Sequence, residues 1–369
     1  MKNIQVLHVI TGGLQREGIS STQLEFFKHM DLNRYKIYVA AVHNDCDEMI
    51  AEYGRAGCVV ISFSDRKKHT VKYFWELVKW LKIVKPNIIH VHGSSSIMSI
   101  ELLAAKIAGI KIRIAHSRNT KADQAKIDKM FRPLFNMLYT FGVACGKEAG
   151  EWLFGNKEFE IIHNGKDFNR FRFDPEQRKE QRKNCKLEKR IVVGHVGCFN
   201  YQKNHNYVVR VFEQFCKSHD NAILYLIGDG PLFEECKMQV SEAGLSGKVI
   251  FAGSVNDVPN RLQSMDIMIF PSRFEGLPNV VLEWQAEGLP CLISDKITTE
   301  CAVSDLVQFA SIEDDPKVWS DKMDELLDKY INRETQGARG TEALKQNGFD
   351  INDAAKKLED IYEELILKS

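Results

Sequence analysis

The chain has 369 residues, of which 44% are hydrophobic and 27% are charged, and its 50 basic residues balance its 50 acidic residues. This length exceeds one ordinary domain core and predicts two domains. The balanced charge gives no electrostatic case for nucleic acid as a partner. No apolar run approaches the roughly 20 residues that span a bilayer. Nine scattered cysteines without a C-x-x-C pair favour a reducing, cytoplasmic compartment over a disulfide framework or a zinc site.

The first half of the chain alternates between short apolar runs and helical patterns. Residues 4–10 (IQVLHVI) predict a buried strand rather than a signal peptide, and Gly12 and Gly13 form the turn that leaves it. Further strands are expected at 36–42, 59–63, 88–92, 111–115, 141–145 and 159–163, with helices at 21–30, 45–56, 71–85 and 100–108. This alternation predicts an α/β domain with a parallel sheet, whose ligand site gathers at the carboxyl ends of the strands.

Histidines fall at two of these strand ends. His90 and His92 close one predicted strand, and His116 follows the next. A lone histidine in such a place is either a satisfied structural residue or a functional one, and the spacing alone favours neither.

Two basic segments in this half allow two interpretations each. Residues 121–140 interleave basic and large apolar side chains around Pro133, and residues 66–69 form a smaller cluster. The longer segment fits a core-facing helix with a solvated side, and the shorter one a solvated loop. Both also fit attachment to an anionic membrane surface.

A change of composition separates the two halves. Residues 172–190 are strongly charged and nearly free of large apolar groups, which indicates an interdomain connection. A second α/β unit starts with IVVGHVG, and strands are expected at 222–227, 249–251, 266–270 and 291–294. We therefore predict domains at 1–171 and 190–348, a linker at 172–189, and an amphipathic terminal segment at 349–369.

The densest pattern in the second half is FPSRFEGLPNVVLEWQAEGLPCLIS, residues 270–294. Asn279 is the expected N-cap of a helix that ends before Gly288. Glu275 then lies just ahead of the helix and Glu283 about one turn inside it. The free N–H groups between them suit a phosphate, and carboxylates suit sugar hydroxyls, so a nucleotide sugar fits both. The alternative is a solvated helix flank with a cap.

The string E-G-L-P-N-V-V-L-E closely resembles the E-x7-E signature of family 4 retaining glycosyltransferases. Six further segments resemble motifs of this family, in the family's order: the Gly-Gly turn, H-x-H-G-S (90–94), N-G-x-D (164–167), Q-K (202–203), G-x-G-P (228–231) and F-x-G (251–253). Each is weak alone, and a simple βα turn accounts for G-x-G-P. The ordered set is specific, and it is most similar to the branch for exopolysaccharide, capsule or O-antigen synthesis.

The resemblance implies a fold and a set of site residues. The fold would be two Rossmann-like α/β domains facing across a cleft (GT-B), with the terminal helix at 349–369 crossing back to the first domain. Glu275 would contact the donor sugar and Glu283 the ribose, with Lys203 at the diphosphate and His116 near the reaction centre. Glu275, His116 and Lys203 form the catalytic set.

The remaining implied residues bind the two substrates. The donor set also contains Gly12, Gly13, Gly197, Gly228, Gly230, Pro231, Gly276, Leu277, Pro278, Asn279 and Val280. The acceptor side contains His92, Ser94 and Arg118. One departure from the family is Cys198, where an arginine is expected, and it removes one of two cationic contacts with the diphosphate.

The implied reaction is retaining transfer of a hexose or N-acetylhexosamine from a nucleotide sugar, expected to be UDP-linked. The acceptor would be a growing glycan carried on a polyprenyl diphosphate, handled by a cytoplasmic enzyme in peripheral contact with the inner face of the cell membrane. Neither a cofactor nor a metal is expected, since no D-x-D lies in a suitable loop. A sugar-nucleotide epimerase, a phosphorylase and an inactive partner of a transferase remain alternatives.

Overall fold

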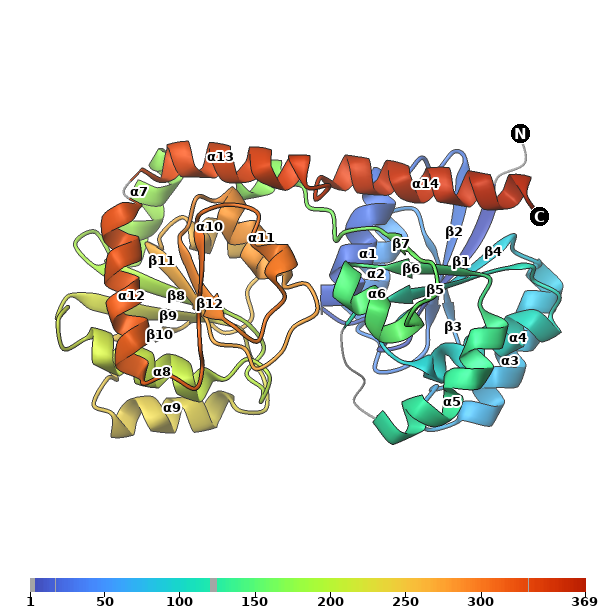
Figure 1. Cartoon of the computed structure of the whole chain (residues 1–369), viewed down its shortest axis with the longest axis horizontal. Coiled ribbons are helices and arrows are strands. Elements are labelled where there is room, and N and C mark those ends of the chain that lie inside the picture. The colour runs from blue at the N-terminus through green and yellow to red at the C-terminus, as the bar shows by residue number, and fades with distance from the viewer. Residues whose placement is uncertain (1–3, 17, 120–124, 331) are drawn as a thin grey trace. The chain divides into compact units, whose positions relative to one another are not determined.

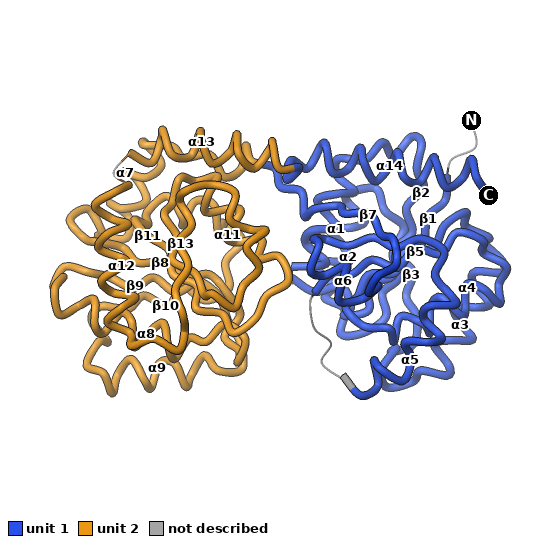
Figure 2. The backbone as a smooth tube through the Cα atoms, in the orientation of Figure 1, with its two compact units in different colours: residues 1–167, 348–369 blue, residues 168–347 orange. Residues whose placement is uncertain are grey.

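A computed structural model describes residues 4–16, 18–119, 125–330 and 332–369 (Figure 1). The chain divides into two compact units. Residues 1–167 together with 348–369 form unit 1, and residues 168–347 form unit 2 (Figure 2). Each unit is a parallel α/β domain, which confirms the predicted fold class. No helix among the described residues is long and apolar enough to cross a membrane.

Unit 1 is built on a seven-stranded sheet in the order β3-β2-β1-β4-β5-β6-β7, with every pair parallel. Its strands are β1 (Ile4–Ile10), β2 (Tyr35–Ala41), β3 (Val59–Ser62), β4 (Ile88–Gly93), β5 (Ile112–Ser117), β6 (Phe141–Ala144) and β7 (Glu160–Ile161). Its helices are α1 (Gly18–His29), α2 (Asp47–Arg55), α3 (Thr70–Val84), α4 (Ser99–Ile107), α5 (Ala125–Leu138), α6 (Lys147–Phe154) and α14 (Ile351–Leu367), with a 3₁₀ turn at Ser96–Met98.

Helices cover both faces of this sheet, so most side chains of its central strands are buried. One core lies under α1, α2 and α14, and the other under α3, α4, α5 and α6. Helix α14 comes last in the sequence but belongs to the first core, through Ile351, Leu358 and Tyr362 among others. The chain therefore returns to unit 1 after completing unit 2 (Figure 2).

Unit 2 is built on a six-stranded parallel sheet in the order β10-β9-β8-β11-β12-β13. Its strands are β8 (Ile191–Val196), β9 (Ala222–Ile227), β10 (Val249–Phe251), β11 (Ile267–Phe270), β12 (Cys291–Ser294) and β13 (Val307–Ala310). Its helices are α7 (Pro175–Asn184), α8 (His205–Phe215), α9 (Phe233–Glu242), α10 (Val258–Leu262), α11 (Asn279–Ala286), α12 (Pro316–Lys329) and α13 (Arg333–Gln346), with 3₁₀ turns at Phe168–Phe171 and Thr299–Cys301.

Both sheets reverse their strand order at one place. The reversal lies between β1 and β4 in unit 1 and between β8 and β11 in unit 2. In doubly wound sheets, ligands bind outside the carboxyl ends of the two strands at such a switch point. The loops after these four strands are therefore where a site is expected.

Two charged segments lie in places that their composition did not indicate. Residues 172–189 fall inside unit 2, because Arg182 of α7 pairs with Asp266 at 3.0 Å and fastens the helix to the edge of β11. Arg66 is buried beside Glu101, with Nε 2.7 Å from Oε1. The arginine guanidinium has five N–H donors, so it can bind buried carbonyl and carboxylate groups as well as water.

No disulfide joins any of the nine cysteines in the described part of the chain.

Candidate active site

The loops that follow β8 and β11 bring two of the predicted catalytic residues together in unit 2. The Lys203 ammonium nitrogen lies 2.7 Å from a Glu275 carboxylate oxygen and 4.5 Å from the centre of the Phe270 ring. The two side chains are only 17% and 10% exposed, respectively. This ion pair therefore sits at the switch point of the sheet, in a partly dehydrated place where its charges act strongly on a ligand.

A ladder of hydrogen bonds fastens the Lys203 loop to the Glu275 loop. The Asn204 side chain donates to the Pro271 carbonyl at 3.1 Å and accepts from the Arg273 guanidinium at 2.9 Å. The Gln202 side chain donates to the Phe274 carbonyl at 3.0 Å. The positioning roles of Asn204 and Arg273 were not predicted from the sequence. The only local signal was an asparagine before a helix, and Asn204 indeed adopts the left-handed conformation, with φ 58°.

The glycines of the G-x-G-P segment allow the loop after β9 to pack against the loop after β8. A Cβ atom on Gly228, where φ is +138°, would lie 2.0 Å from the carbonyl oxygen of Gly197. One on Gly230 would lie 2.6 Å from the carbonyl oxygen of Phe199. Gly197 in turn lies under the aliphatic stem of Lys203. The close packing that these glycines allow therefore determines the position of the loop that carries Lys203. Pro231, the last residue of the motif, is exposed.

Helix α11 presents its amino-terminal end beside the ion pair. The helix begins at Asn279 and its N-cap is Pro278, so the predicted cap at Asn279 is wrong by one residue. Proline suits this position because it needs no N–H there, and for the same reason it offers no donor. No side chain of the described residues caps the helix, and the Val281 N–H donates to the Pro278 carbonyl at 3.1 Å. A helix start of this kind suits an anion. Glu283 is buried in the second turn, and Gly288 ends the helix with φ 70°, as predicted.

Two buried histidines beside Lys203 stay neutral. Burial and the charge of Lys203 lower the pKa of His195 to about 4, and burial, His195 and Lys203 lower the pKa of His205 to about 2. The ring of His205 stacks on Phe199 at 3.8 Å between centres. Cys198, which replaces the family's arginine, is exposed at the tip of the same loop. At neutral pH the positive charge of this loop therefore comes from Lys203.

In unit 1 the Gly-Gly turn follows β1. A Cβ on Gly13, where φ is +92°, would lie 1.7 Å from the His43 carbonyl oxygen, so this glycine is required for packing. Gly12 is exposed with open space around its Cα. Asp45 holds the turn by accepting the Leu14 N–H at 2.8 Å. Of the two predicted residues, Gly12 is the one whose backbone a ligand can approach.

Four histidines meet on one face of the sheet in unit 1, because parallel register pairs His8 with His90 and His92 with His116. All four are buried under α1 and α14, and Tyr362 of α14 lies 2.6 Å from the Nδ1 atom of His90. The cluster contains the predicted residues His92 and His116 and the unpredicted residues His8, His90 and Tyr362. Side chains two residues apart on a strand lie on the same face of the sheet, so the H-x-H pattern was the sequence signal for a histidine cluster.

Burial lowers the pKa of His8 to about 3, and it lowers the pKa of His90, His92 and His116 well below the ordinary value. The cationic side chain of Arg118, itself buried, acts in the same direction. All four imidazoles are therefore neutral at pH 7, and the charge in the cluster is that of Arg118.

Hydrogen bonds from residues of α5 and α6 hold the segment that follows β4. The Ser94 carbonyl accepts from the Trp152 indole at 3.1 Å, and the Ser96 N–H donates to Asp128 at 2.7 Å. Arg132 pairs with Asp128, so it points inward rather than toward solvent with the lysines of its segment. Ser94 itself is half-buried at the end of β4. Residues 121–124 of the predicted basic segment lie outside the described residues.

Residues 176–343 match the family described as glycosyl transferases group 1. A protein of Bacillus subtilis (strain 168) named "Putative glycosyltransferase EpsF" is 29% identical, over 97% of this chain and 96% of that protein. The UDP-Gal:alpha-D-GlcNAc-diphosphoundecaprenol alpha-1,3-galactosyltransferase of Escherichia coli is 24% identical, over 99% and 98%. These matches identify the chain as a glycosyltransferase.

Solved structures share the fold of this glycosyltransferase. Anabaena Alr3699/HepE in complex with UDP superposes with a TM-score of 0.82 at 15% identity, covering 98% of this chain and 100% of that one. WaaG, a glycosyltransferase involved in lipopolysaccharide biosynthesis, gives 0.71 at 14% identity, with 97% and 99% covered. The fold is thus GT-B, with two Rossmann-like domains.

The histidine cluster of the glycosyltransferase is also where three side chains come close enough to suggest a metal. Ligand atoms of His8, His90 and His92 lie within 4.8 Å of one another. However, His8 Nδ1 and His92 Nε2 are 2.9 Å apart in a hydrogen bond. Two nitrogens on a tetrahedral zinc stand about 3.3 Å apart, given bonds of about 2.0–2.1 Å. The cation of Arg118 also borders the cluster, so the arrangement fits a hydrogen-bonded network better than a metal centre.

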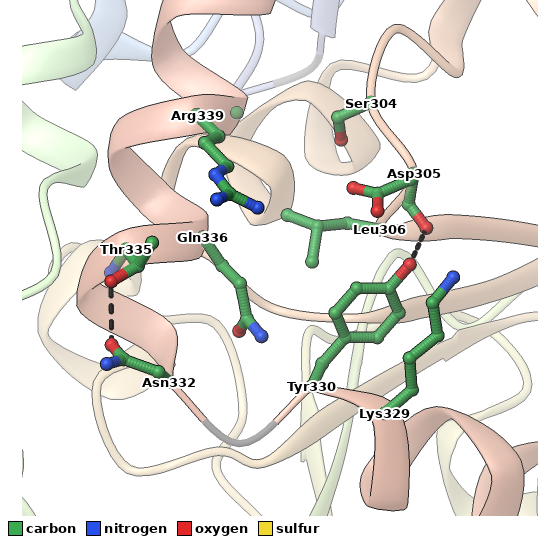
Figure 3. A pocket seen from close by; sticks show the side chains of 10 residues that line it. Ser304, Asp305, Leu306, Lys329, Tyr330, Asn332, Thr335, Gln336 and Arg339 are labelled. Atoms are coloured by element: carbon green, nitrogen blue, oxygen red, sulfur yellow. Dashed lines mark hydrogen bonds between the residues drawn. The ribbon is translucent and has the colours of Figure 1, made fainter.

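A hollow of about 490 Å³ lies elsewhere in unit 2 (Figure 3). It is lined by Ser304, Asp305, Leu306, Lys329, Tyr330, Asn332, Thr335, Gln336, Arg339 and Gly340. Residues 304–306 precede β13, so the hollow lies at the amino end of that strand, whereas Lys203 and Glu275 follow the carboxyl ends of β8 and β11. None of the predicted site residues lines this hollow. In doubly wound sheets substrates bind at the carboxyl ends of the strands, not at the amino ends.

Proposed function

We propose that this glycosyltransferase moves a hexose or N-acetylhexosamine from a UDP-sugar, with retention, to a growing glycan on a polyprenyl diphosphate. The observation that carries the proposal is the Lys203–Glu275 pair beside the uncapped end of α11. A cation and free amides suit a diphosphate, and a carboxylate suits sugar hydroxyls. The donor sugar-nucleotide contains both chemistries side by side.

The pair also indicates how the donor binds. With no ligand, Lys203 and Glu275 satisfy each other. The donor replaces both partners at once, because its diphosphate takes the ammonium group and its sugar hydroxyls take the carboxylate. Glu283 takes the ribose hydroxyls from the second turn of α11. A ligand that lacks the diphosphate leaves Lys203 without a new partner, and a ligand that lacks the sugar leaves Glu275 without one.

In the transfer step the bond between the anomeric carbon and the diphosphate oxygen breaks. The acceptor hydroxyl forms its bond to that carbon from the same face, and its proton passes to the departing diphosphate oxygen. Negative charge develops on the diphosphate as the bond breaks, and Lys203 with the α11 amides stabilises it. This supply of positive charge is why we propose that no metal is required.

The substrate classes rest on relatives. HepE was solved in complexes with UDP and UDP-glucose, and the Escherichia coli relative is named for UDP-Gal and a diphosphoundecaprenol acceptor. A Staphylococcus aureus relative, 25% identical, is named a capsular polysaccharide biosynthesis glycosyltransferase. These names support a uridine donor, a lipid-linked acceptor and a role in cell-surface polysaccharide synthesis.

The first test is thermal unfolding with UDP, GDP, ADP and TDP, each with and without EDTA. A ligand at about 100 times its Kd adds about 2.7 kcal/mol, so UDP is expected to raise Tm by roughly 5 °C or more. The rise is expected to be equal with EDTA and to disappear in Lys203→Ala. A rise with another nucleotide alone would contradict the uridine assignment, and a rise abolished by EDTA would contradict metal independence.

We also propose that one face of unit 1 rests on an anionic membrane. Helices α3, α4 and α5 enclose an apolar groove of about 180 Å³. Two of these helices also expose large apolar side chains, namely Val71, Trp75 and Ile83 on α3 and Met130 and Met137 on α5, with Val71 73% and Met130 69% exposed. The exposed lysines of the two helices are Lys72, Lys79, Lys82, Lys126 and Lys129. Apolar side chains among lysines are the composition of a peripheral membrane surface.

This membrane face is tested by flotation with vesicles that contain phosphatidylglycerol. Trp75→Glu with Met130→Glu is expected to lower vesicle binding at least tenfold, because each change removes apolar contact and adds repulsion worth about 1 kcal/mol. The matched control is Met238→Glu on α9 of unit 2, which is 60% exposed and should leave binding unchanged. Equal binding by all three proteins would overturn the assignment of this face.

A further inference from the structure

A continuous chain of hydrogen bonds crosses the core of unit 1. The Arg118 guanidinium lies 2.9 Å from the Asn164 side-chain oxygen and 3.2 Å from His92 Nδ1. His92 Nε2 lies 2.9 Å from His8 Nδ1. The chain continues through the Tyr362 hydroxyl, at 3.2 Å from His8 Nε2.

From Tyr362 the chain runs on toward the end of β5. The hydroxyl lies 2.6 Å from His90 Nδ1, and His90 Nε2 lies 3.0 Å from His116 Nδ1. The chain stops at His116 Nε2, which is buried and has no hydrogen-bond partner among the described residues. This atom is therefore the open end of the network, because every other imidazole nitrogen of the four histidines has a partner.

The direction of every bond follows from the residue at the other terminus. Arginine has five N–H donors and no acceptor, so His92 Nδ1 must accept from Arg118. A neutral imidazole that accepts at one nitrogen carries its proton on the other, so His92 Nε2 donates to His8 Nδ1. By the same rule His8 Nε2 donates to the Tyr362 oxygen. The histidines are neutral because they are buried, so none donates at both nitrogens.

The second half of the chain follows in the same way. The Tyr362 oxygen accepts from His8 and donates its own proton to His90 Nδ1. His90 Nε2 then donates to His116 Nδ1, and the remaining proton of His116 stands on Nε2. In the opposite direction His92 would point an N–H at the Arg118 guanidinium, two donors face to face, and His116 Nε2 would be a bare lone pair.

We propose that Arg118 and Tyr362, acting through His92, His8 and His90, hold His116 as its Nε2–H tautomer and so make it a hydrogen-bond donor to the substrate. This rests on the proposed function and on the place that the family resemblance implies for His116, near the reaction centre, where its Nε2–H would meet a sugar oxygen. A donor to that oxygen cannot also remove the acceptor's proton. The departing diphosphate therefore has to take the proton, as the transfer step above requires.

Tyr362, a residue of α14, links the two halves of this network through its hydroxyl group. His8 and His90 are 5.1 Å apart between ring centres, and the Tyr362 hydroxyl bridges their outer nitrogens. His8, His90, His92 and Tyr362 are positioning residues, since they act through His116. Without the hydroxyl, His90 and His116 lose their connection to Arg118, and both directions become open to them.

The experiment uses the full-length protein with 15N-labelled histidine. Long-range 15N–1H spectra distinguish protonated from bare ring nitrogens, and His116 is assigned from the signal lost in His116→Gln. Wild-type His116 is expected to carry its proton on Nε2 in the absence of any ligand. Tyr362→Phe is expected to give intermediate signals for both His116 nitrogens and to lower kcat for transfer about tenfold, as the loss of one aligned hydrogen bond would.

Tyr35→Phe is the matched control. The Tyr35 hydroxyl also joins the sheet to α14, at 3.2 Å from the Glu359 carbonyl and 3.1 Å from Glu363, but it is outside the network. It should leave the His116 spectrum and kcat unchanged.

Each outcome decides a separate statement. A wild-type proton on Nδ1, or a charged His116, overturns the proposed direction without any variant being needed. An unchanged His116 spectrum in Tyr362→Phe overturns the role of Tyr362. If the spectra are as expected but His116→Gln transfers sugar at the wild-type rate, the network stands and the placement of His116 at the substrate falls.

Discussion

Glu275→Ala is expected to lower the rate of sugar transfer by about 1,000-fold while leaving the fold intact. The carboxylate is held by Lys203 in the resting protein, and in the proposed complex it holds the sugar where bond breaking develops charge. Losing one such contact in a dehydrated site costs about 100- to 1,000-fold. Glu275→Gln, which keeps the shape but not the charge, should recover only part of the rate. The measurement is transfer from UDP-sugar under single-turnover conditions.

A surface pair in the same unit provides the control. Glu234 lies 3.0 Å from Lys237 on α9, but it is 78% exposed. Exposed pairs contribute about 0–1 kcal/mol, so Glu234→Ala should change neither the rate nor Tm appreciably. A Glu275→Ala protein with a near-normal rate would remove Glu275 from the catalytic set. The effect on unfolding is expected to be small, because Lys203 remains in partial contact with water.

Lys203→Ala is expected to lower the transfer rate by about 100- to 1,000-fold and to abolish the stabilisation by UDP. Lys203 supplies the positive charge of its loop, since the neighbouring histidines are neutral and the family's arginine is replaced by Cys198. Charge on the departing diphosphate would then be met by the α11 amides alone. Lys203→Arg should restore part of the rate, whereas Lys237→Ala should have no effect. UDP affinity is measured by calorimetry and the rate by single turnover.

The two variants together test whether the donor exchanges partners with the pair. If Glu275 holds Lys203 until the diphosphate arrives, Glu275→Ala releases the ammonium group, and UDP without a sugar should bind several-fold tighter than to wild type. UDP-sugar should gain nothing, because it loses its contact with Glu275. Weaker UDP binding to Glu275→Ala would contradict the exchange. The double variant should be about as slow as the worse single variant, since contacting residues are not additive.

The sequence predicted the parts of the site that depend on local order. Strand ends are visible as apolar runs followed by glycine or proline, and the carboxyl ends of parallel strands meet at one edge. The family resemblance assigned Lys203 and Glu275 to the same donor site, and the two residues, 72 positions apart in the sequence, are in contact. The glycines at 228 and 230 were recognised as a motif, but their physical reason, the carbonyl groups of the neighbouring loop, is a contact between segments.

Contacts between distant segments account for what was missed. Tyr362 meets His8 across 354 residues, and no local pattern announces a tyrosine that faces a histidine on another element. Composition also fails to tell a solvated arginine from a paired one, as Arg66 and Arg132 show. Both belong to runs of basic residues whose lysines do face solvent. Whether such an arginine is buried or solvated depends on its partner carboxylate, which lies outside the basic run.

The return of α14 to unit 1 has a consequence for biosynthesis. A ribosome releases β1 to β7, then the whole of unit 2, and only afterwards the helix that covers the histidine-bearing face of the first sheet. Unit 2 can close as soon as residue 347 has emerged, whereas unit 1 waits with an apolar layer uncovered. A nascent chain in that interval is the form that chaperones or proteases meet. Premature termination within residues 348–369 would thus spare the Lys203–Glu275 pair and damage the domain that was synthesised first.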